Sequence, residues 1–242
     1  MNVFPSLCRG CSRHFSSGSG KLAIERYTSK CHFKELRGIN LALITPHDEL
    51  YHATERQLPS HFQHLPWWGF LWPGGHALTQ FILADEYRKI FEGKSLFDFG
   101  CGCGVSGIAA VKARAKSVVA CDIDPFAIDA TMYNAALNGV HKYFSYTSKN
   151  VIGDVNSIDA EVVIAGDIFY DDRLAQAILP WFEQLSVAGK TVIFGDPGRW
   201  VLQRMGREER EKRFETLANF DFPEEYGKLN NGIVGGFVYK MR

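Results

Sequence analysis

The sequence predicts an α/β fold in which a mostly parallel β-sheet is covered by helices on both faces. From Lys94 to the end of the chain, short apolar segments alternate with segments that have helical spacing. These apolar segments contain few charges, as is typical of strands buried on both faces of a parallel sheet. Several of them end in glycine- or aspartate-rich turns, and ligands of such folds bind beyond the carboxyl ends of the strands. We therefore expect a functional site at that edge of the sheet.

The expected elements follow one another in order along the chain. A strand or extended arm is expected in residues 36–51, and residues 52–73 form an aromatic segment that Gly and Pro interrupt. Helices are expected in residues 74–91, 105–112, 126–138, 173–185 and 202–214. Strands are expected in residues 95–99, 117–120, 144–149, 161–165, 191–194 and 232–241.

The composition fits one domain with a sizeable core and argues against several classes of function. The chain has 242 residues, of which 46% are hydrophobic. Lys and Arg together number 27, as do Asp and Glu, so a basic surface for nucleic acid is not expected. The sequence has no uncharged apolar run of about 18 residues, so no membrane span is expected. We expect a monomer without a bound metal.

The six cysteines fit a reducing compartment better than a disulfide framework. Cys101, Cys103 and Cys121 fall in an expected ligand loop or at the end of an expected strand. Cys8 and Cys11 form a C-x-x-C pair, but no second pair follows at the spacing of a zinc finger. A metal or redox role for this pair is therefore not expected.

Residues 1–30 have the composition of a mitochondrial transit peptide and leader. They contain five basic residues, six serines and one acid, Glu25, without the continuous apolar stretch of a secretory signal. The alternative is a plain disordered tail. The segment from Arg13 to Ser16 resembles a matrix-processing site, with cleavage near Phe15. Removing residues 1–15 leaves 25 basic and 27 acidic residues, a net charge of −2. We expect a mitochondrial matrix protein whose folded domain covers residues 31–242.

The clearest motif is a glycine-rich loop that runs from Asp98 through Gly100, Gly102 and Gly104. It follows an apolar strand and precedes an apolar helix. Glycines let the backbone turn tightly and approach a ligand closely, and the helix N-terminus offers N–H groups. Asp122 ends the next strand, about 20 residues further on, where a carboxylate can accept both ribose hydroxyls of a nucleoside.

Two kinds of nucleoside ligand fit this loop. Residues 102–107 also satisfy the G-x-G-x-x-G pattern of dinucleotide-binding folds. Asp98, however, would repel a pyrophosphate and suits the cationic amino group of a methionine. With Gly100, the loop resembles motif I of class I methyltransferases, which implies a seven-stranded Rossmann-like sheet and S-adenosylmethionine as the methyl donor. Ile123 is then expected on the adenine face, and Asn150 at the adenine edge, with Asp154 as the competing choice.

A second motif lies at the end of the fourth strand of this region. Asp167-Ile-Phe-Tyr170 matches the D-x-x-Y form of a motif found in one branch of protein lysine methyltransferases. A carboxylate at Asp167 can hold and orient an acceptor ammonium by charge-assisted hydrogen bonds. Tyr170 can line the channel and present its π face to the cation. The alternative is that Asp167 caps the next helix and Tyr170 is core; Asp171 and Asp172 are better candidates for capping.

Four segments together resemble the electron transfer flavoprotein β-subunit lysine methyltransferase family. They are Trp72-Pro-Gly-Gly, the glycine loop, the D-x-x-Y segment and Gly195-Asp-Pro-Gly-Arg199. The resemblance runs from about residue 36 to the C-terminus. It implies methylation of lysines beside the recognition loop of the flavoprotein β subunit, and weaker electron transfer from acyl-CoA dehydrogenases. It also implies that Trp72 borders the donor pocket. His76 departs from the glutamine that is usual in the family.

Three other functions remain open at this point. A small-molecule N-methyltransferase shares the fold and the donor site, and a closed pocket over Tyr170 would favour it. An NAD-dependent oxidoreductase would use the G-x-G-x-x-G pattern instead. A non-catalytic module that retains the donor pocket is the third.

Overall fold

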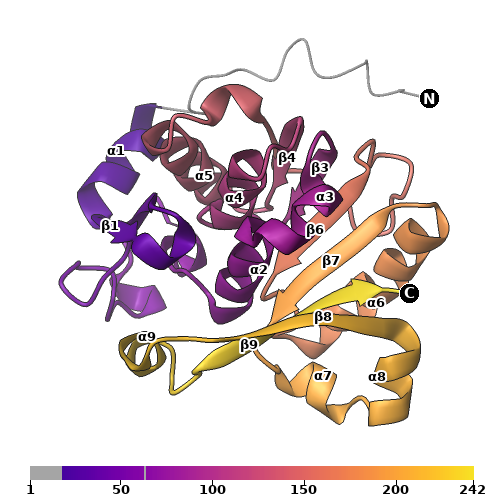
Figure 1. Cartoon of the computed structure of the whole chain (residues 1–242). Coiled ribbons are helices and arrows are strands. Elements are labelled where there is room, and N and C mark those ends of the chain that lie inside the picture. The colour runs from indigo at the N-terminus through magenta and orange to yellow at the C-terminus, as the bar shows by residue number, and fades with distance from the viewer. Residues whose placement is uncertain (1–17, 63) are drawn as a thin grey trace.

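A seven-stranded sheet lies at the centre of the molecule (Figure 1). The computed structural model describes residues 18–62 and 64–242. The strand order is β5-β4-β3-β6-β7-β9-β8; neighbours from β5 to β7 are parallel, and β9 runs antiparallel to β7 and β8. The strands are β3 (Ser95–Phe99), β4 (Ser117–Cys121), β5 (Phe144–Thr147), β6 (Val162–Gly166), β7 (Thr191–Asp196), β8 (Phe214–Asp221) and β9 (Gly235–Met241). The mostly parallel sheet expected from the sequence is confirmed.

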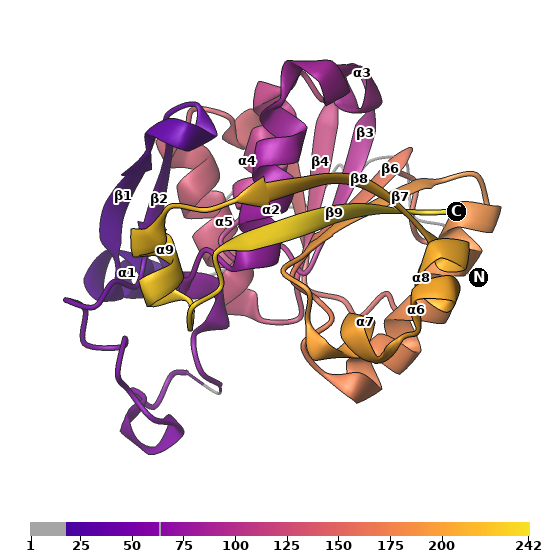
Figure 2. The same ribbon diagram turned by 60° about the horizontal axis from the view of Figure 1, so that its bottom comes forward.

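Helices cover both faces of this sheet, as Figure 2 shows. One face is covered by α2 (Pro73–Leu83), α4 (Val105–Lys112) and α5 (Pro125–Leu137). The other is covered by α6 (Asp172–Val187), α7 (Trp200–Arg204) and α8 (Arg207–Arg213). Because successive strand residues point to opposite faces, Leu96 packs into the first layer and Phe97 into the second. This double coverage explains why the strands are apolar.

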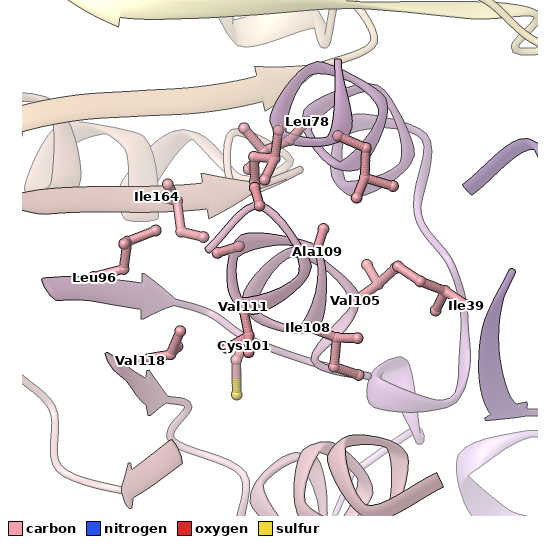
Figure 3. Packing of buried hydrophobic residues seen from close by; sticks show 14 of the residues in the cluster. Ile39, Leu78, Leu96, Cys101, Val105, Ile108, Ala109, Val111, Val118 and Ile164 are labelled. Atoms are coloured by element: carbon pink, nitrogen blue, oxygen red, sulfur yellow. The ribbon is translucent and has the colours of Figure 1, made fainter. Parts of the chain in front are cut away.

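The core of the first layer forms around α4. Ile108 and Ala109 of α4 are completely buried and belong to the same cluster as Leu78 of α2 and the sheet residues Leu96 and Ile164, all of which Figure 3 labels around α4. Burying a leucine or isoleucine fully contributes about 1.5–3 kcal/mol. This packing holds the first turn of α4, and with it the glycine loop, against the sheet.

An N-terminal unit packs on the outside of α5. It consists of α1 (Gly18–Tyr27) and an antiparallel hairpin, β1 (Ser29–Phe33) with β2 (Ile39–Leu43). Ile24 is completely buried in a cluster that includes residues of α5. Within the described residues, the fold therefore already includes residues 18–30, which the expected boundary at residue 31 leaves out. The expected cleavage near Phe15 and the Cys8–Cys11 pair lie outside the described residues.

The structure differs from the expected elements in two further places. The helix expected in residues 74–91 ends at Leu83, because Ala84 is extended, and only a short α3 (Arg88–Phe91) follows. The helix expected in residues 202–214 is divided into α7 and α8, and Phe214 begins β8, which sequence patterns missed. A bulge between Thr216 and Ala218 interrupts the alternation of β8, so it lacks a clean strand pattern.

The remaining short elements connect this framework. They are α9 (Glu224–Leu229) and the 3₁₀ turns at Lys34–Leu36, Glu55–Gln57, Trp67–Gly69, Asp85–Tyr87 and His141–Tyr143. Within the described ranges, no helix is long and apolar enough to cross a membrane.

Candidate active site

The glycine loop adopts a backbone that only glycine accepts readily. Gly100, Gly102 and Gly104 have φ values of 66°, 51° and 79°, all in the left-handed region. A Cβ at Gly104 would lie 2.7 Å from the Thr131 Cγ2 atom, so this residue also allows a close approach to α5. At Gly102 a Cβ would meet nothing within 4 Å, so the loop is open on that side.

Two polar side chains of α5 hold the loop from behind. The Thr131 hydroxyl donates to the Gly102 carbonyl at 3.0 Å, and the Asn134 amide donates to the Cys103 carbonyl at 2.9 Å. Both side chains are buried. Neither residue is among the predicted site residues, although two polar residues three positions apart on one face of an otherwise apolar helix are a signal that the sequence contains.

Asp122 lies beside the open part of the loop. Its Oδ2 atom accepts from the Gly102 N–H at 3.0 Å, and its Oδ1 atom accepts from the Asp124 N–H at 3.0 Å. Each carboxylate oxygen keeps acceptor capacity for a further donor. Burial raises the pKa of Asp122, and these N–H bonds act in the opposite direction. The next side chain, Ile123, is 73% exposed and offers an apolar surface beside the carboxylate.

Asp98 lies underneath the loop and is only 2% exposed. Its Oδ2 atom accepts from the Gly107 N–H in α4 at 3.0 Å. A Cβ at Gly107 would lie 2.9 Å from that oxygen, so the glycine permits the contact. Burial raises the pKa of Asp98 to about 7. Its expected role at the amino group of a methyl donor stays a prediction.

These residues fit an S-adenosyl nucleoside. The open side of Gly102 gives room for a ligand, the neighbouring Asp122 carboxylate can accept ribose hydroxyls, and Ile123 can cover a purine. Asn150 is less clearly placed. It is exposed, three residues beyond β5, and its Oδ1 atom accepts from the Ile152 N–H at 3.1 Å. Its contact with the adenine edge, like that of the competing Asp154, stays a prediction.

On the acceptor side, Asp167 is held by two segments that are distant in the sequence. Its Oδ2 atom accepts from the Gly74 N–H at the start of α2 at 2.8 Å. Its Oδ1 atom accepts from Arg199 Nε at 2.7 Å. The backbone of Asp167 has a φ of 59°, a conformation that non-glycine residues adopt only where the surroundings hold it. Asp171, not Asp167, caps α6, through a 2.9 Å bond from the Leu174 N–H.

The first turn of α2 fits closely onto the ends of β6 and β7. A Cβ at Gly74 would lie 2.4 Å from the Gly195 carbonyl oxygen and 2.7 Å from the Asp167 nitrogen. A Cβ at Gly166 would lie 2.7 Å from the Gly75 Cα atom. These glycines let the helix N-terminus reach Asp167, which explains the Pro-Gly-Gly sequence physically.

The loop after β7 positions Arg199. Asp196 is completely buried and accepts from the N–H groups of Gly198 and Arg199 at 2.7 and 2.6 Å. Burial raises the pKa of Asp196 to about 7. In the sequence, this segment is recognisable only as part of a family pattern, which gives Arg199 no role. Its pairing with Asp167 joins residues 32 positions apart, which no local pattern reveals.

Tyr170 lies between the donor and acceptor sides. Its side chain is 65% exposed. Desolvation and the charges of Asp122, Asp171 and Asp167 raise its pKa, which means that its hydroxyl group lies within electrostatic reach of both sides. The core position considered for Tyr170 is therefore wrong, and the exposure of the ring shows that it is not enclosed.

Trp72 precedes this helix turn and lies in an aromatic cluster. Its Nε1 atom donates to the Trp67 carbonyl at 2.9 Å, and its ring is tilted against those of Trp67 and Phe70. Its contact with a methyl donor stays a prediction. His76, in the first turn of α2, is completely buried, and its ring stacks on that of Phe222 with 4.6 Å between the centroids. Burial lowers the pKa of His76 to about 4.

Among residues 18–62 and 64–242, no group of three or more His, Cys, Asp or Glu side chains is arranged to hold a metal ion. The glycine loop and Asp122 follow the ends of β3 and β4 on the donor side. On the acceptor side, Asp167 and Arg199 follow the ends of β6 and β7 and meet Gly74 at the start of α2.

The comparisons with known proteins agree with this class of site. The profile of the ribosomal protein L11 methyltransferase family (PrmA) matches residues 73–190. A methyltransferase structure from Pyrococcus horikoshii, a presumed RNA methyltransferase, has the same fold with a TM-score of 0.52 at 18% identity. The structural match covers 79% of this chain and 96% of the Pyrococcus horikoshii chain. Fold and site together define a class I methyltransferase, a class that uses S-adenosylmethionine.

Curated relatives identify the family. The electron transfer flavoprotein β-subunit lysine methyltransferase of Danio rerio is 33% identical over 176 residues, which are 72% of this chain and 66% of the relative. The homologue from Caenorhabditis elegans is 34% identical over 220 residues, which are 84% of this chain and 88% of the relative. The chain belongs to the electron transfer flavoprotein β-subunit lysine methyltransferase family. It spans about two thirds of the length of the zebrafish protein.

Proposed function

We propose that this protein is an S-adenosylmethionine-dependent lysine N-methyltransferase that acts on the β subunit of electron transfer flavoprotein. The observation that carries the proposal is that the segment from Asp167 to Tyr170 directly follows β6 and lies against the glycine loop, since a Cβ at Gly100 would be 3.3 Å from the Ile168 Cγ2 atom. The names of the relatives support the substrate.

The donor side supplies binding and orientation. When bound, S-adenosylmethionine supplies an electrophilic methyl group on a cationic sulfur. Asp122 would accept hydrogen bonds from the ribose, Ile123 would cover the adenine, and the open side of Gly102 would let the backbone approach the ligand. Holding the reacting atoms in line can supply several kcal/mol through proximity alone.

The acceptor side orients an amine. A lysine ammonium has a reference pKa of about 10.4, so it must lose a proton before it attacks. Asp167 is 2% exposed at its side chain and fixed by two partners, so it can act as a rigid acceptor for one N–H. Tyr170 can contact the aliphatic part of the lysine, or its cation, with the exposed ring. The proton leaves to solvent, and no covalent intermediate is required.

The exposure of the acceptor side favours a protein over a small molecule. Tyr170 and Trp67 are both more than half exposed, so the entrance is not enclosed. Beyond the Arg199 loop lies a surface hollow lined by Pro197, Leu202, Gln203 and Phe237 among others. A protein segment around the target lysine has room on this surface, whereas a small-molecule enzyme buries most of its substrate.

The cellular setting belongs to the same proposal. The composition of residues 1–30 supports import into the mitochondrial matrix. There the enzyme would modify lysines beside the recognition loop of the flavoprotein β subunit and weaken electron transfer from acyl-CoA dehydrogenases. We propose a monomer, and the neutral net charge gives no support for a nucleic-acid partner.

A direct methylation assay tests the proposal. Purified enzyme is incubated with isotope-labelled S-adenosylmethionine and mitochondrial matrix proteins, and the products are analysed by mass spectrometry. The expected result is label on lysines of the flavoprotein β subunit. Label on other proteins alone, or only on molecules below about 1 kDa, would contradict the substrate assignment and favour a small-molecule N-methyltransferase.

Binding measurements separate an oxidoreductase and a non-catalytic module from the proposed enzyme. The family relationship gives no support to an NAD-dependent oxidoreductase. Calorimetric titration should show binding of S-adenosylhomocysteine and none of NAD. A non-catalytic module would bind S-adenosylhomocysteine yet transfer no label to any matrix component.

A further inference from the structure

The buried ion pair between Asp167 and Arg199 changes what an acceptor amine meets in this site. We propose that Arg199 is a positioning residue that neutralises Asp167, so that the acceptor lysine loses its proton at a lower pH than beside a free carboxylate. The inference rests on the proposed function, because it requires an amine as acceptor.

The contact is built into the fold. Arg199 Nε lies 2.7 Å from Asp167 Oδ1, and the Arg199 side chain is 26% exposed against 2% for Asp167. Asp196 fixes the backbone of Arg199 through its N–H, and Gly74 fixes the other carboxylate oxygen. The guanidinium therefore lies on the more open side of the pair, where a substrate side chain would arrive.

Electrostatics gives this arrangement a consequence for the reaction. An unpaired carboxylate within about 4–6 Å stabilises an ammonium and raises its pKa by about 1–3 units. Lysine already titrates near 10.4, so a free Asp167 would hold the acceptor in its unreactive form. The Asp167–Arg199 ion pair has no net charge, yet each oxygen of Asp167 can still accept a hydrogen bond. It can orient a neutral amine without favouring the ammonium.

The chemical step balances with these groups. The lysine ammonium releases one proton to solvent, its nitrogen forms a bond to the methyl carbon, and the carbon–sulfur bond breaks with its electron pair on sulfur. The products are N-methyl-lysine, S-adenosylhomocysteine and one proton. The released proton goes to solvent and not to either member of the pair.

Other titratable groups act on the pair, either directly or through Tyr170 and Tyr226, and enter the test. They are Asp196 on the same loop, Tyr226 of α9, Tyr170, Asp171 and Asp122 at the neighbouring strand ends, Cys103 of the glycine loop and His76 of α2. Burial raises the pKa of Asp196 to about 7, and the pKa values of both tyrosines lie above their ordinary value. Between pH 8 and 10, Asp196 is therefore largely ionised, and the raised pKa values of the two tyrosines keep them largely neutral.

The test is the pH dependence of kcat, which reports ionisations in the enzyme–substrate complex. The substrate is the flavoprotein β subunit at saturating concentration. For Arg199→Gln we expect the rising limb of the kcat–pH profile to move to higher pH by about 1 pH unit or more. The loss of kcat should be largest at pH 8, and kcat should recover towards pH 10. Arg199→Lys keeps the charge, so its limb should stay near the wild-type position even if kcat falls. Arg204→Gln is the matched control, because Arg204 lies on α7 and pairs with Asp172 instead.

A second variant decides the matter if Arg199→Gln does not fold. Asp167→Asn removes the negative charge and keeps an oxygen for the Gly74 N–H. Because the Arg199 charge then disfavours a nearby ammonium, the rising limb of the kcat–pH profile should move to lower pH. A uniform loss of kcat at every pH in Arg199→Gln, or an upward shift in Asp167→Asn, overturns the inference. Failure of the wild-type enzyme to label any lysine is a different result and overturns the proposed function itself.

Discussion

The donor and acceptor halves of the site are built in different ways. In the donor half, Asp122 bonds to the N–H groups of Gly102 and Asp124, close to its own strand end. In the acceptor half, Asp167 bonds to Gly74 and Arg199, which come from other parts of the chain. The donor half therefore depends on the glycine backbone and on contacts within the successive elements from β3 to α5, whereas the acceptor half depends on the packing of α2 and of the loop after β7.

This difference suggests how the two halves can vary independently. A strand, a glycine turn and a following aspartate suffice for a nucleoside site, so this half is general to the fold. An acceptor site assembled from three distant segments can change when any one of them changes. Variants in each half should consequently separate binding of the donor from transfer of the methyl group.

The largest effect is expected for Asp167→Ala. Loss of the oriented carboxylate should lower the rate of lysine methylation by about 100-fold or more, which corresponds to about 2.7 kcal/mol. The Kd for S-adenosylhomocysteine, measured by calorimetry, should change by less than about threefold, since Asp167 bonds within the acceptor half. Equal losses of binding and rate would show that the two halves are not separable.

Asp122→Ala should weaken binding of the donor more than it lowers the rate of methyl transfer, and its effect should be somewhat smaller than that of Asp167→Ala. Removing a charged acceptor of ribose hydroxyls costs about 2 kcal/mol, so the Kd for S-adenosylhomocysteine should rise by about 30-fold. Methylation at saturating donor should recover in large part. A Kd that remains within a factor of two of wild type would place the ribose elsewhere.

Gly74→Ala tests the close packing on which the acceptor half depends. The added Cβ would lie 2.4 Å from a backbone oxygen, so we expect a loss of about 2 kcal/mol in the free energy of unfolding, measured with urea. Gly75→Ala is the matched control, because the same atom there meets only the Val105 Cγ1 atom at 4.0 Å. Equal stability of the two variants would contradict the proposed contact.

The smallest effect concerns the buried carboxyl of the donor half. The pKa of Asp98 in the folded protein, about 7, lies above its ordinary value of 3.8. The protonated carboxyl is therefore favoured by folding at low pH, and this stability is lost as the pH rises through 7. Relative to wild type, Asp98→Asn should gain about 1–2 kcal/mol in the free energy of unfolding between pH 6 and pH 8.

Urea unfolding of both proteins at the two pH values measures this difference. Asp196, whose pKa is also about 7, is present in both proteins, so its contribution cancels. A constant difference between Asp98→Asn and wild type across this range would mean that Asp98 remains ionised in the folded state.

Sequence patterns predicted most of the central sheet and the donor half. The apolar strands β3, β4, β6 and β7 were found within a residue or two, because burial on both faces demands apolar residues. The tight turn of the loop is predictable from its three closely spaced glycines, because glycine adopts the left-handed conformation that each of these positions has. Strand β8 escaped because its bulge breaks the period of two, and α1 because its packing on α5 is a tertiary contact.

By itself, the sequence determined the class of fold, the glycine turn and the identity of the carboxylates at the strand ends, since each of these depends on local conformation or on simple burial. Only the tertiary structure decided that Arg199 pairs with Asp167, that Thr131 and Asn134 hold the glycine loop, and that Asp98 lies beneath it. Those contacts depend on the distances between distant segments once the helices have packed on the sheet, and no local sequence pattern encodes such distances.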